Sequence, residues 1–411
     1  MKLNQLGFLE YIYKNIIVFS CIFFICLSFM VTGNTVSAKE AEPYIRVGIL
    51  QRQDSVAISA NNDFVVKDVD NGKNYKFDRA KVVEIKQDER KVFINKKGKE
   101  TTTIVVAVKN NDPVIVNGKR YRGSLIIQPH KAGLTVINRV LIDDYLKGVI
   151  PEEMPYDWDI EALKAQAVAA RTYALYDKMD RKHTKEGFDV CATTDCQVYG
   201  GIDAESSPTN NAVEQTKGQV LMYKNEPICA VFHAAAGSYT ENSEDAWGVT
   251  VPYLRAVDNK EEKSPYEQWS ENITVMELSR IISQNFENIG TIKQIDTSNF
   301  KQEVGNKQKV IRFTGSNKKV VELTGAQLRS ILQLNSSNFI INVTADNKKV
   351  KSGNIKRIDK PEKEVVNIIG SGLGHRLGLS QWGAKSLADK GENYRDILHH
   401  YYTNVELKTI Y

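Results

Sequence analysis

The sequence predicts an α+β protein in which a strand-rich N-terminal part leads into a mixed α/β core with an inserted α+β subdomain. Three observations predict this arrangement. Residues 43–140 hold short apolar runs separated by Asn-Asn, Asp-Asn-Gly and Asn-Gly turn signals. A single long helical pattern follows Trp158. A later stretch is enriched in Asn, Lys and Ser. We therefore divide the chain into residues 1–38, 43–140, 141–263, 264–357 (the insertion) and 358–411 (a return to the core).

The composition is that of a folded protein without a marked charge. Of the 411 residues, 42% are hydrophobic and 26% are charged, and the formal net charge is +5. This length is ample for a hydrophobic core and for two or three domains. No basic stretch has aromatic residues interleaved with it, so the sequence predicts no nucleic-acid partner.

Residues 1–38 have the features of a targeting segment. Two lysines precede an uncharged apolar run, 16–31, and a small-residue pattern, Val36-Ser37-Ala38, follows it. This order is typical of a secretory signal peptide. The run is also near the lower length limit for a membrane-spanning helix, and the lysines would keep its N-terminal side in the cytoplasm. Either alternative places the residues from about Lys39 onward outside the cytoplasmic membrane, in a secreted or a membrane-anchored protein.

Residues 43–140 are predicted to form a small antiparallel sheet or barrel. The runs Tyr44–Leu50, Thr103–Val108 and Ser124–Ile127 are rich in β-branched residues, and turn signals separate the short runs at regular spacing. No residue pattern with a chemical role occurs in 43–120, so we expect a structural role for that stretch.

The next segment places two carboxylates between two prolines. Pro151 and Pro155 bracket Glu152 and Glu153. Because proline restricts its own backbone and that of the preceding residue, we expect a stiff loop here and not a helix. A helix should follow Asp159, its N-cap, with one face made of Leu163, Ala167, Ala170 and Ala174. A carboxylate held rigidly before a buried helix suits a general acid/base, and the alternative is a pair of solvated charges.

Two cysteines follow this helix in a C-x4-C arrangement. His183 precedes Cys191 and Cys196. Thiolates and an imidazole suit a tetrahedral zinc ion, and outside the membrane two neighbouring cysteines can also form a disulfide. The sequence therefore leaves three alternatives open: a zinc site, a disulfide or two free thiols. A zinc ion here would be structural, because two thiolate ligands usually mark a structural site.

A predicted hairpin leads to the next candidate residue. Strands are expected over 219–222 and 227–232, with a turn between them. The second strand ends at His233, which begins a loop of small and polar residues. A histidine after an apolar strand is ordinarily structural. Trp247, near the end of the loop, is either a core residue or a surface on which a sugar ring stacks.

The insertion and the C-terminal part have their own signals. Helices are expected at Val275–Asn285 and Gly325–Leu332, with strands between them. The glycines of 370–374 lack the G-x-G-x-x-G spacing and no βαβ unit follows, so they do not predict a dinucleotide site. A short helix over 394–402 should close the chain.

Five segments resemble the signature of the SpoIID/LytB family of sporulation and cell-wall proteins. They are GVIPEEMP with the following WDIEALKAQAVAARTYAL, DVCATTDCQVYGG (Asp189–Gly201), FHAAAGSYTENSEDAWG (Phe232–Gly248), PYLRAVD (Pro252–Asp258) and GHRLGLSQWGA (Gly374–Ala384). They occur in the family's order. Residues 43–140 would then be the strand-rich N-terminal part of the family's domain, and 141–263 its catalytic core.

The resemblance implies a lytic transglycosylase that cleaves the MurNAc–GlcNAc bond of peptidoglycan, in sporulation, with Glu153 as the acid/base. In zinc-bearing relatives a histidine often precedes the second cysteine, whereas this chain has Asp195. Arg376 stands where the family usually has glycine, which puts the local backbone in question. The residues that the resemblance places at the sugar are His233, Ser238, Thr240, Glu241, His375, Ser380 and Gln381.

The expected partners are peptidoglycan glycan strands, a peptidoglycan amidase and membrane proteins of the sporulation machinery. Two other functions stay open. The first is a non-catalytic cell-wall-binding module that stimulates a partner amidase, as the LytB name implies. The second is a zinc hydrolase built on His183, Cys191, Cys196 and His233, against which the two thiolate ligands argue.

Overall fold

The computed structural model describes residues 41–89, 91–95, 97–99, 103–108, 112–259, 263–300, 310–345, 348–349 and 354–411. Glu42–Tyr411 form one compact unit that combines helices with several sheets, so the predicted α+β class is confirmed. The targeting segment expected over residues 1–38 lies outside the described residues. Among those that are described, no helix is both long and apolar enough to cross a membrane.

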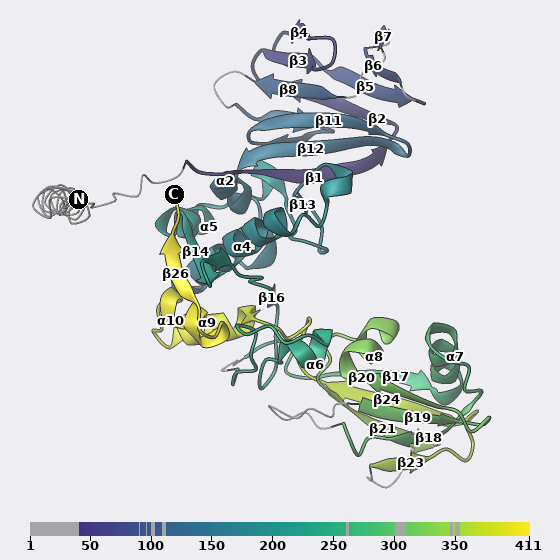
Figure 1. Ribbon diagram of the computed structural model, residues 1–411. Coiled ribbons are helices and arrows are strands. Elements are labelled where there is room, and N and C mark those ends of the chain that lie inside the picture. The colour runs from purple at the N-terminus through teal and green to yellow at the C-terminus, as the bar shows by residue number, and fades with distance from the viewer. Residues whose placement is uncertain are drawn as a thin grey trace, which may run out of the picture. The chain divides into compact units, whose positions relative to one another are not determined.

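Two mostly antiparallel sheets form the strand-rich part, as predicted (Figure 1). In the described residues their strand orders are β13-β1-β12-β11-β8-β3-β4 and β10-β9-β2-β5-β6-β7. Their strands alternate buried and less buried residues, as Val56, Ile58 and Ala60 do in β2, and the buried sets share one core. The strands are β1 (Tyr44–Gln53), β2 (Ser55–Ala60), β3 (Phe64–Asp68), β4 (Lys73–Phe77), β5 (Val83–Asp88), β6 (Lys91–Ile94), β7 (Lys97–Lys99), β8 (Ile104–Val108), β9 (Val114–Val116), β10 (Lys119–Tyr121), β11 (Ser124–His130), β12 (Gly133–Leu141) and β13 (Val190–Cys191).

The short strand β13 brings the cysteine segment to the edge of the first sheet. It pairs in parallel with β1, with Gly48 opposite Cys191. The ring of Phe188 lies against Gly48, where a Cβ would be 2.7 Å from the ring. This close approach requires glycine at position 48, and it fixes where the segment after Cys191 begins.

The core is built around helix α4 (Ile160–Asp180), which Asp159 caps as predicted by accepting a hydrogen bond from the backbone N–H of Glu161. All four residues of the predicted apolar face are fully or almost fully buried, and Arg171 is buried as well. Arg171 forms an ion pair with Asp143 at 2.7 Å, which explains how a charge is accommodated there. The other helices of the core are α2 (Ile142–Lys147), α3 (Ile150–Glu153), α5 (Ser207–Gln215), α6 (Ser243–Trp247), α9 (Gln381–Asp389) and α10 (Tyr394–Tyr401).

The glutamate pair lies on a helical turn, so the expected non-helical loop is wrong. Pro151 occupies the first turn of α3, where the missing backbone N–H costs nothing. Met154 is extended, with φ −131° and ψ 140°, as the residue before Pro155 should be. The two prolines therefore limit α3 to a single turn without preventing it.

The hairpin that was predicted before His233 is only partly formed. Strands β14 (Gln219–Tyr223) and β15 (Glu226–Pro227) pair as expected, and β26 (Glu406–Thr409) joins them. The continuous strand expected over 227–232 is wrong, because residues 228–231 are not in a strand. The next strand is β16 (Phe232–His233), which pairs in parallel with β25 (Leu379–Ser380).

The insertion has two sheets of its own and the two predicted helices. Helices α7 (Val275–Asn285) and α8 (Gly325–Leu332) have the expected bounds, and Thr274 and Thr324 cap them. The last strand, β24, extends this part past the expected boundary at residue 357, because it pairs with β17 and β21. The strands are β17 (Trp269–Thr274), β18 (Ile292–Asp296), β19 (Val310–Gly315), β20 (Val320–Thr324), β21 (Phe339–Ala345), β22 (Lys348–Lys349), β23 (Ile355–Arg357) and β24 (Glu364–Gly370).

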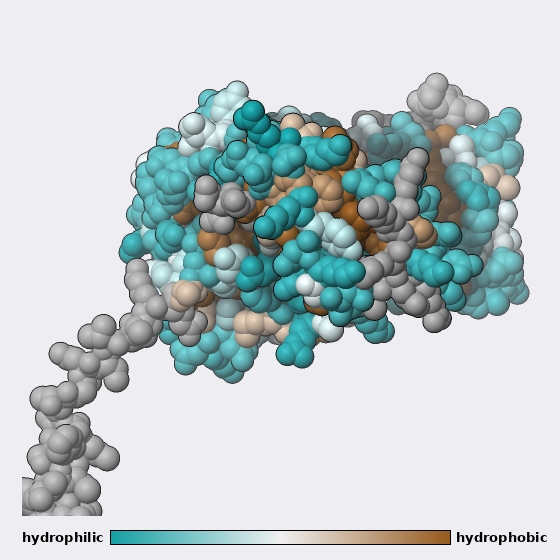
Figure 2. Space-filling model, turned by 90° about the horizontal axis from the view of Figure 1, so that it is seen from above, coloured by the Kyte–Doolittle hydropathy of each residue, from teal (hydrophilic) through white to brown (hydrophobic). Residues whose placement is uncertain are grey.

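On the face drawn in Figure 2, hydrophilic residues predominate, and the hydrophobic residues gather toward the middle of that face. The large apolar side chains of the described residues lie mostly inside three core clusters. The exposed exceptions include Tyr156, Trp247 and Phe286. Single exposed apolar residues are normal on a protein surface, so each of them gains meaning only from its surroundings.

Candidate active site

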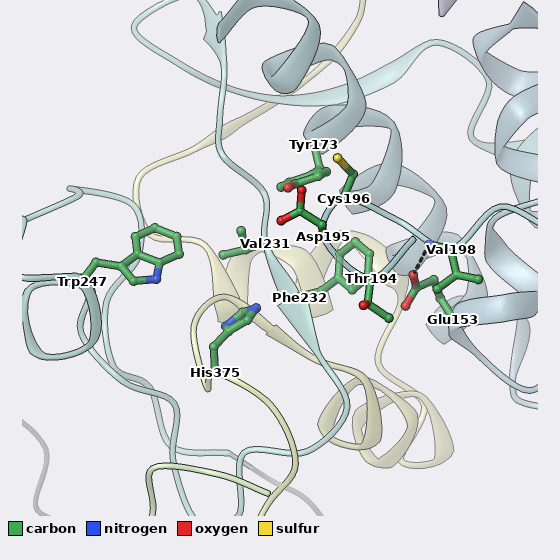
Figure 3. Close-up of a pocket in the computed structure, with 10 residues that line it drawn as sticks. All are labelled: Glu153, Tyr173, Thr194, Asp195, Cys196, Val198, Val231, Phe232, Trp247 and His375. Carbon is green, nitrogen blue, oxygen red and sulfur yellow. Dashed lines mark hydrogen bonds between the residues drawn. The ribbon is translucent and has the colours of Figure 1, made fainter. Parts of the chain in front are cut away.

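A cavity of about 320 Å³ collects residues from segments that are far apart in the sequence (Figure 3). Helices α3, α4 and α6, the cysteine segment, strand β16 with the residue before it, and the glycine-rich stretch before β25 each contribute to its wall. The described residues that line it are Glu153, Tyr173, Thr194, Asp195, Cys196, Val198, Val231, Phe232, Trp247 and His375.

Glu153 lies at the end of α3 and reaches this cavity, whereas Glu152 is exposed. The backbone N–H of Val198 donates a hydrogen bond of 3.3 Å to Oε1 of Glu153. Burial raises the pKa of Glu153 above its usual value, and hydrogen bonds from Val198 and from the side chain of Gln381 partly oppose this rise. Of the two carboxylates, Glu153 is thus the one whose surroundings suit proton transfer.

Strand β25 and helix α9 place Gln381 beside Glu153. Ser380 is fully buried and caps α9 by accepting a hydrogen bond of 3.3 Å from the backbone N–H of Gly383. Its partner in β16 is His233. Gln381, the first residue of the helix, is buried and hydrogen-bonds the Glu153 carboxylate. Ser380 therefore supports the site from behind, and Gln381 belongs to it.

Two neighbouring histidines lie at the cavity, one in its wall and one behind it. His375 lines it, and its ring lies 5.3 Å from the ring of His233, which is buried behind it. Nδ1 of His233 donates to the carbonyl of Leu377 at 3.1 Å, and Nδ1 of His375 accepts from the backbone N–H of Leu377 at 3.0 Å. Burial lowers the pKa of both histidines, that of His375 to about 4. Both rings are therefore neutral near pH 7, which suits hydrogen bonding and not the transfer of a proton to a ligand.

The loop after His233 holds three further predicted residues, none of which is among the described residues that line the cavity. Ser238 is exposed. Thr240 is buried and accepts a hydrogen bond of 2.9 Å from the backbone N–H of Val257. Glu241 is buried and accepts a hydrogen bond of 3.0 Å from the hydroxyl of Ser337, in the insertion. Contact of these three residues with substrate stays a prediction.

Arg376 occupies a position where the family that the sequence resembles usually has glycine, and the structure shows what the arginine contacts there. Its φ is 64°, in the left-handed region that favours glycine. The side chain is fully buried and donates to the carbonyls of Ala236 at 3.2 Å and Tyr239 at 2.8 Å. It also lies 3.5 Å from Oε2 of Glu241. The arginine thus connects the loop after His233 to the segment that carries His375.

The cysteine segment assembles a cluster of metal-binding side chains. Nε2 of His183 lies 3.2 Å from Sγ of Cys196, which lies 3.1 Å from Sγ of Cys191. Oδ2 of Asp195 completes the group, and the four ligand atoms lie within 4.8 Å of one another. Both thiols are free in this structure. His233 is not a member of the cluster, so the arrangement does not supply the ligand set that the zinc-hydrolase alternative needs.

The cluster and Glu153 share one short stretch of chain. Cys196 lies in the cluster, and Val198, two residues later, donates to Glu153. Between them, Gln197 is fully buried, accepts a hydrogen bond from the Tyr145 hydroxyl at 3.0 Å and donates to the carbonyl of Ala170 at 3.3 Å. Anything that fixes the cluster therefore also fixes the donor to Glu153.

Several cavity residues were not predicted from the sequence. Tyr173 lies on α4 beside the predicted apolar face, and Thr194 lies between the two cysteines. Val198 takes part through its backbone N–H, for which no side-chain pattern exists. Trp247 was left open between a core and a surface role, and its 45% exposure makes the core role wrong.

The comparisons with known proteins agree with the resemblance seen in the sequence. The family model described as Stage II sporulation protein matches residues 130–223. An uncharacterized protein of Brachyspira hyodysenteriae is 32% identical over 342 residues, which cover 81% of this chain and 86% of that protein. The amidase enhancer of Bacillus subtilis is 33% identical over 303 residues, 64% of this chain and 40% of that protein. Stage II sporulation protein D of Bacillus amyloliquefaciens is 29% identical over 285 residues, 66% of this chain and 75% of that protein. The chain belongs to the SpoIID family.

Proposed function

We propose that this protein is a lytic transglycosylase that cleaves the MurNAc–GlcNAc bond of peptidoglycan, with Glu153 as its single acid/base. The observation that carries the proposal is the setting of Glu153 in the cavity wall. Burial raises its pKa, while Val198 and Gln381 hydrogen-bond its carboxylate. A group that must first give and then take a proton needs both forms to be accessible.

The proposed reaction has two steps that both use Glu153. Protonated Glu153 donates its proton to the oxygen of the glycosidic bond, and the bond to the anomeric carbon breaks. The C6 hydroxyl of the same MurNAc then attacks that carbon and returns its proton to the Glu153 carboxylate, which closes a 1,6-anhydro ring. No water is consumed, and Glu153 ends protonated. During the step in which Glu153 is charged, the donors from Val198 and Gln381 stabilise the carboxylate.

Hydrolysis is the chemical alternative within the same cavity. A glycosidase that uses water or an enzyme nucleophile needs a second carboxylate at a set spacing. Asp195 also lines the cavity, but its carboxylate lies 3.1 Å from Nζ of Lys182 and belongs to the metal-binding cluster. These interactions favour a supporting role for Asp195 and leave Glu153 to act alone.

The cluster suits a structural zinc ion held by His183, Cys191 and Cys196, with Asp195 as the fourth donor. Two sulfurs, an imidazole and a carboxylate are donors that zinc accepts, and their ligand atoms already converge. When bound, the ion would supply a cross-link between the end of α4 and the cysteine segment. The cysteine segment would then be fixed in place, and with it the buried Gln197 and the backbone N–H of Val198 that donates to Glu153.

The biological setting is proposed from the relatives. Two of them carry the name Stage II sporulation protein D, which supports a role in sporulation. We propose that the protein acts there with membrane proteins of the sporulation machinery. We infer an extracytoplasmic location, with the protein either anchored by its N-terminal segment or secreted. Glycan strands of the wall would be its substrate.

A second function is favoured by one comparison. The Bacillus subtilis relative at 33% identity is named an amidase enhancer, and this chain covers 40% of that protein. The corresponding alternative is a wall-binding module that stimulates a peptidoglycan amidase without cleaving glycan. It predicts that a partner amidase is stimulated equally by the wild-type chain and by Glu153→Gln.

The test is mass spectrometry of the products from purified, peptide-free glycan strands. Wild type should release chains that end in anhydro-MurNAc, and Glu153→Gln should not. Glu152→Gln is the matched control, because it changes the neighbouring but exposed carboxylate in the same way. Reducing ends in place of anhydro ends would mean hydrolysis. Loss of cleavage in both variants would remove the special role of Glu153, and no cleavage by zinc-loaded wild type would favour the amidase-stimulating module.

A further inference from the structure

Trp247 occupies the end of the cavity that lies away from Glu153. In Figure 3 the two side chains stand on opposite sides of the group that lines the cavity, with His375 and Phe232 between them. The indole is 45% exposed. Within the part of the chain that the structure describes, its ring forms no aromatic pair and no cation–π contact. A large, half-exposed ring is therefore part of the cavity wall.

The backbone that carries Trp247 is held firmly in spite of this exposure. The hydroxyl of Ser243 accepts hydrogen bonds from the backbone N–H of Val251 at 2.7 Å and from the Arg255 guanidinium at 2.8 Å. Arg255 also binds both carboxylate oxygens of Glu244, at 2.9 and 2.5 Å. These bonds close the residues on either side of Trp247 into one unit, so the ring is presented by an ordered support and little freedom is lost when a ligand covers it.

The chemistry between the two ends is that of a carbohydrate site. A pyranose has an apolar face of C–H groups and a rim of hydroxyls, and an aromatic ring with nearby polar groups matches both. The walls supply polar groups from Tyr173, Thr194 and His375. The charged residues among the described lining are Glu153 and Asp195, both acidic.

We propose that Trp247 forms a sugar-stacking subsite for a ring of the bound glycan other than the two joined by the scissile bond. The subsite rests on the proposed function for the identity of its ligand, since peptidoglycan supplies a long strand of linked pyranoses. Because Phe232 and His375 lie between Trp247 and Glu153 in Figure 3, we place the stacked ring at a different position from the two rings that flank the acid. Trp247 thus selects for strands long enough to reach both ends.

The test measures binding by the full chain with Glu153→Gln, which prevents turnover, to peptide-free GlcNAc–MurNAc oligosaccharides of two, four and six sugars by isothermal titration calorimetry. Adding Trp247→Ala should weaken the binding of the hexasaccharide about tenfold and should remove most of the affinity gained between two and six sugars. Trp247→Phe should lose less. Phe286→Ala is the matched control, because that ring is 43% exposed, lies just beyond α7 and does not line the cavity.

The outcomes separate this inference from the proposed function. Equal affinities with and without Trp247, at every length, overturn the subsite even if wild type releases anhydro ends. Binding that depends on Trp247, with no cleavage by the wild-type chain, supports the subsite and overturns the transglycosylase. Absence of binding to all three oligosaccharides overturns both. Equal unfolding midpoints of the variants show that the comparison concerns binding and not folding.

Discussion

Replacing Arg376 by the glycine that relatives usually carry should destabilise this protein, although glycine is the residue that the backbone favours there. Relief of the left-handed conformation should return about 1 kcal/mol. Against this, Arg376→Gly removes a fully buried guanidinium and leaves the buried Glu241 without it, which costs about 3–5 kcal/mol. The net loss should be about 2–4 kcal/mol, because the second effect is the larger.

The assay is urea unfolding of wild type, Arg376→Gly, Glu241→Gln and the double variant. If the arginine is retained because it neutralises Glu241, the double variant should be less destabilised than the sum of the single variants, by 1 kcal/mol or more in roughly the range seen for coupled neighbours. An Arg376→Gly variant as stable as wild type would refute this reasoning. Strict additivity would refute the coupling to Glu241 and would assign the cost to the two carbonyls that Arg376 binds.

Three other predictions follow from the same surroundings. Because burial gives Glu153 a higher pKa in the folded protein than its ordinary 4.5, its carboxylate opposes folding above that pH, so Glu153→Gln should raise the thermal midpoint at pH 7 and the gain should vanish at pH 3. A gain that is equal at both pH values would show that the charge of Glu153 is not the cause of the gain. The full chain should hold one zinc ion by native mass spectrometry, and Cys196→Ser should lose it; retention of zinc in that variant would contradict the cluster. Ser380→Ala should lower the free energy of unfolding in urea by about 1 kcal/mol, because it removes the cap of α9. It should also lower kcat, because Gln381 directly follows the cap. Unchanged stability and rate would show that the cap is not needed.

Local signals in the sequence were enough for the longer helices, although not for the single turn of α3. Asp159 caps a helix that starts where it was predicted to start, and the helices that Thr274 and Thr324 cap have the predicted bounds, because a cap and an apolar period are both encoded within a few residues. The prediction of a strand over 227–232 was wrong because the end of that strand depends on a distant segment and not on local signals. Its partner, β25, is far away in the sequence, and pairing is confined to two residues, so no local pattern specifies where the strand stops.

The candidate site was predictable only where a motif pointed to a side chain. Glu153 and His375 do line the cavity. Thr240 and Ser380 instead accept hydrogen bonds from the backbone N–H groups of Val257 and Gly383, and this distinguishes a motif residue that supports a site from one that faces it. The donor from Val198 could not be found from sequence, because every residue type except proline has that N–H.

One carboxyl group can serve both steps only if neither its protonated nor its charged form is strongly favoured. The surroundings of Glu153 have two opposite effects on its pKa. Burial favours the acid, which the first step consumes, while the donors from Val198 and Gln381 favour the carboxylate, which the second step requires. Removing either donor would raise the pKa further and make Glu153 a weaker acid for the first step. Opening the cavity would lower the pKa, so less of Glu153 would be protonated at neutral pH and its carboxylate would be a weaker base for the second step. The donors come from two distant segments, one next to the cysteine cluster and one at the start of α9. The balance at Glu153 is therefore a property of the whole core, which is why a supporting residue such as Ser380 should affect the rate without touching the glycan.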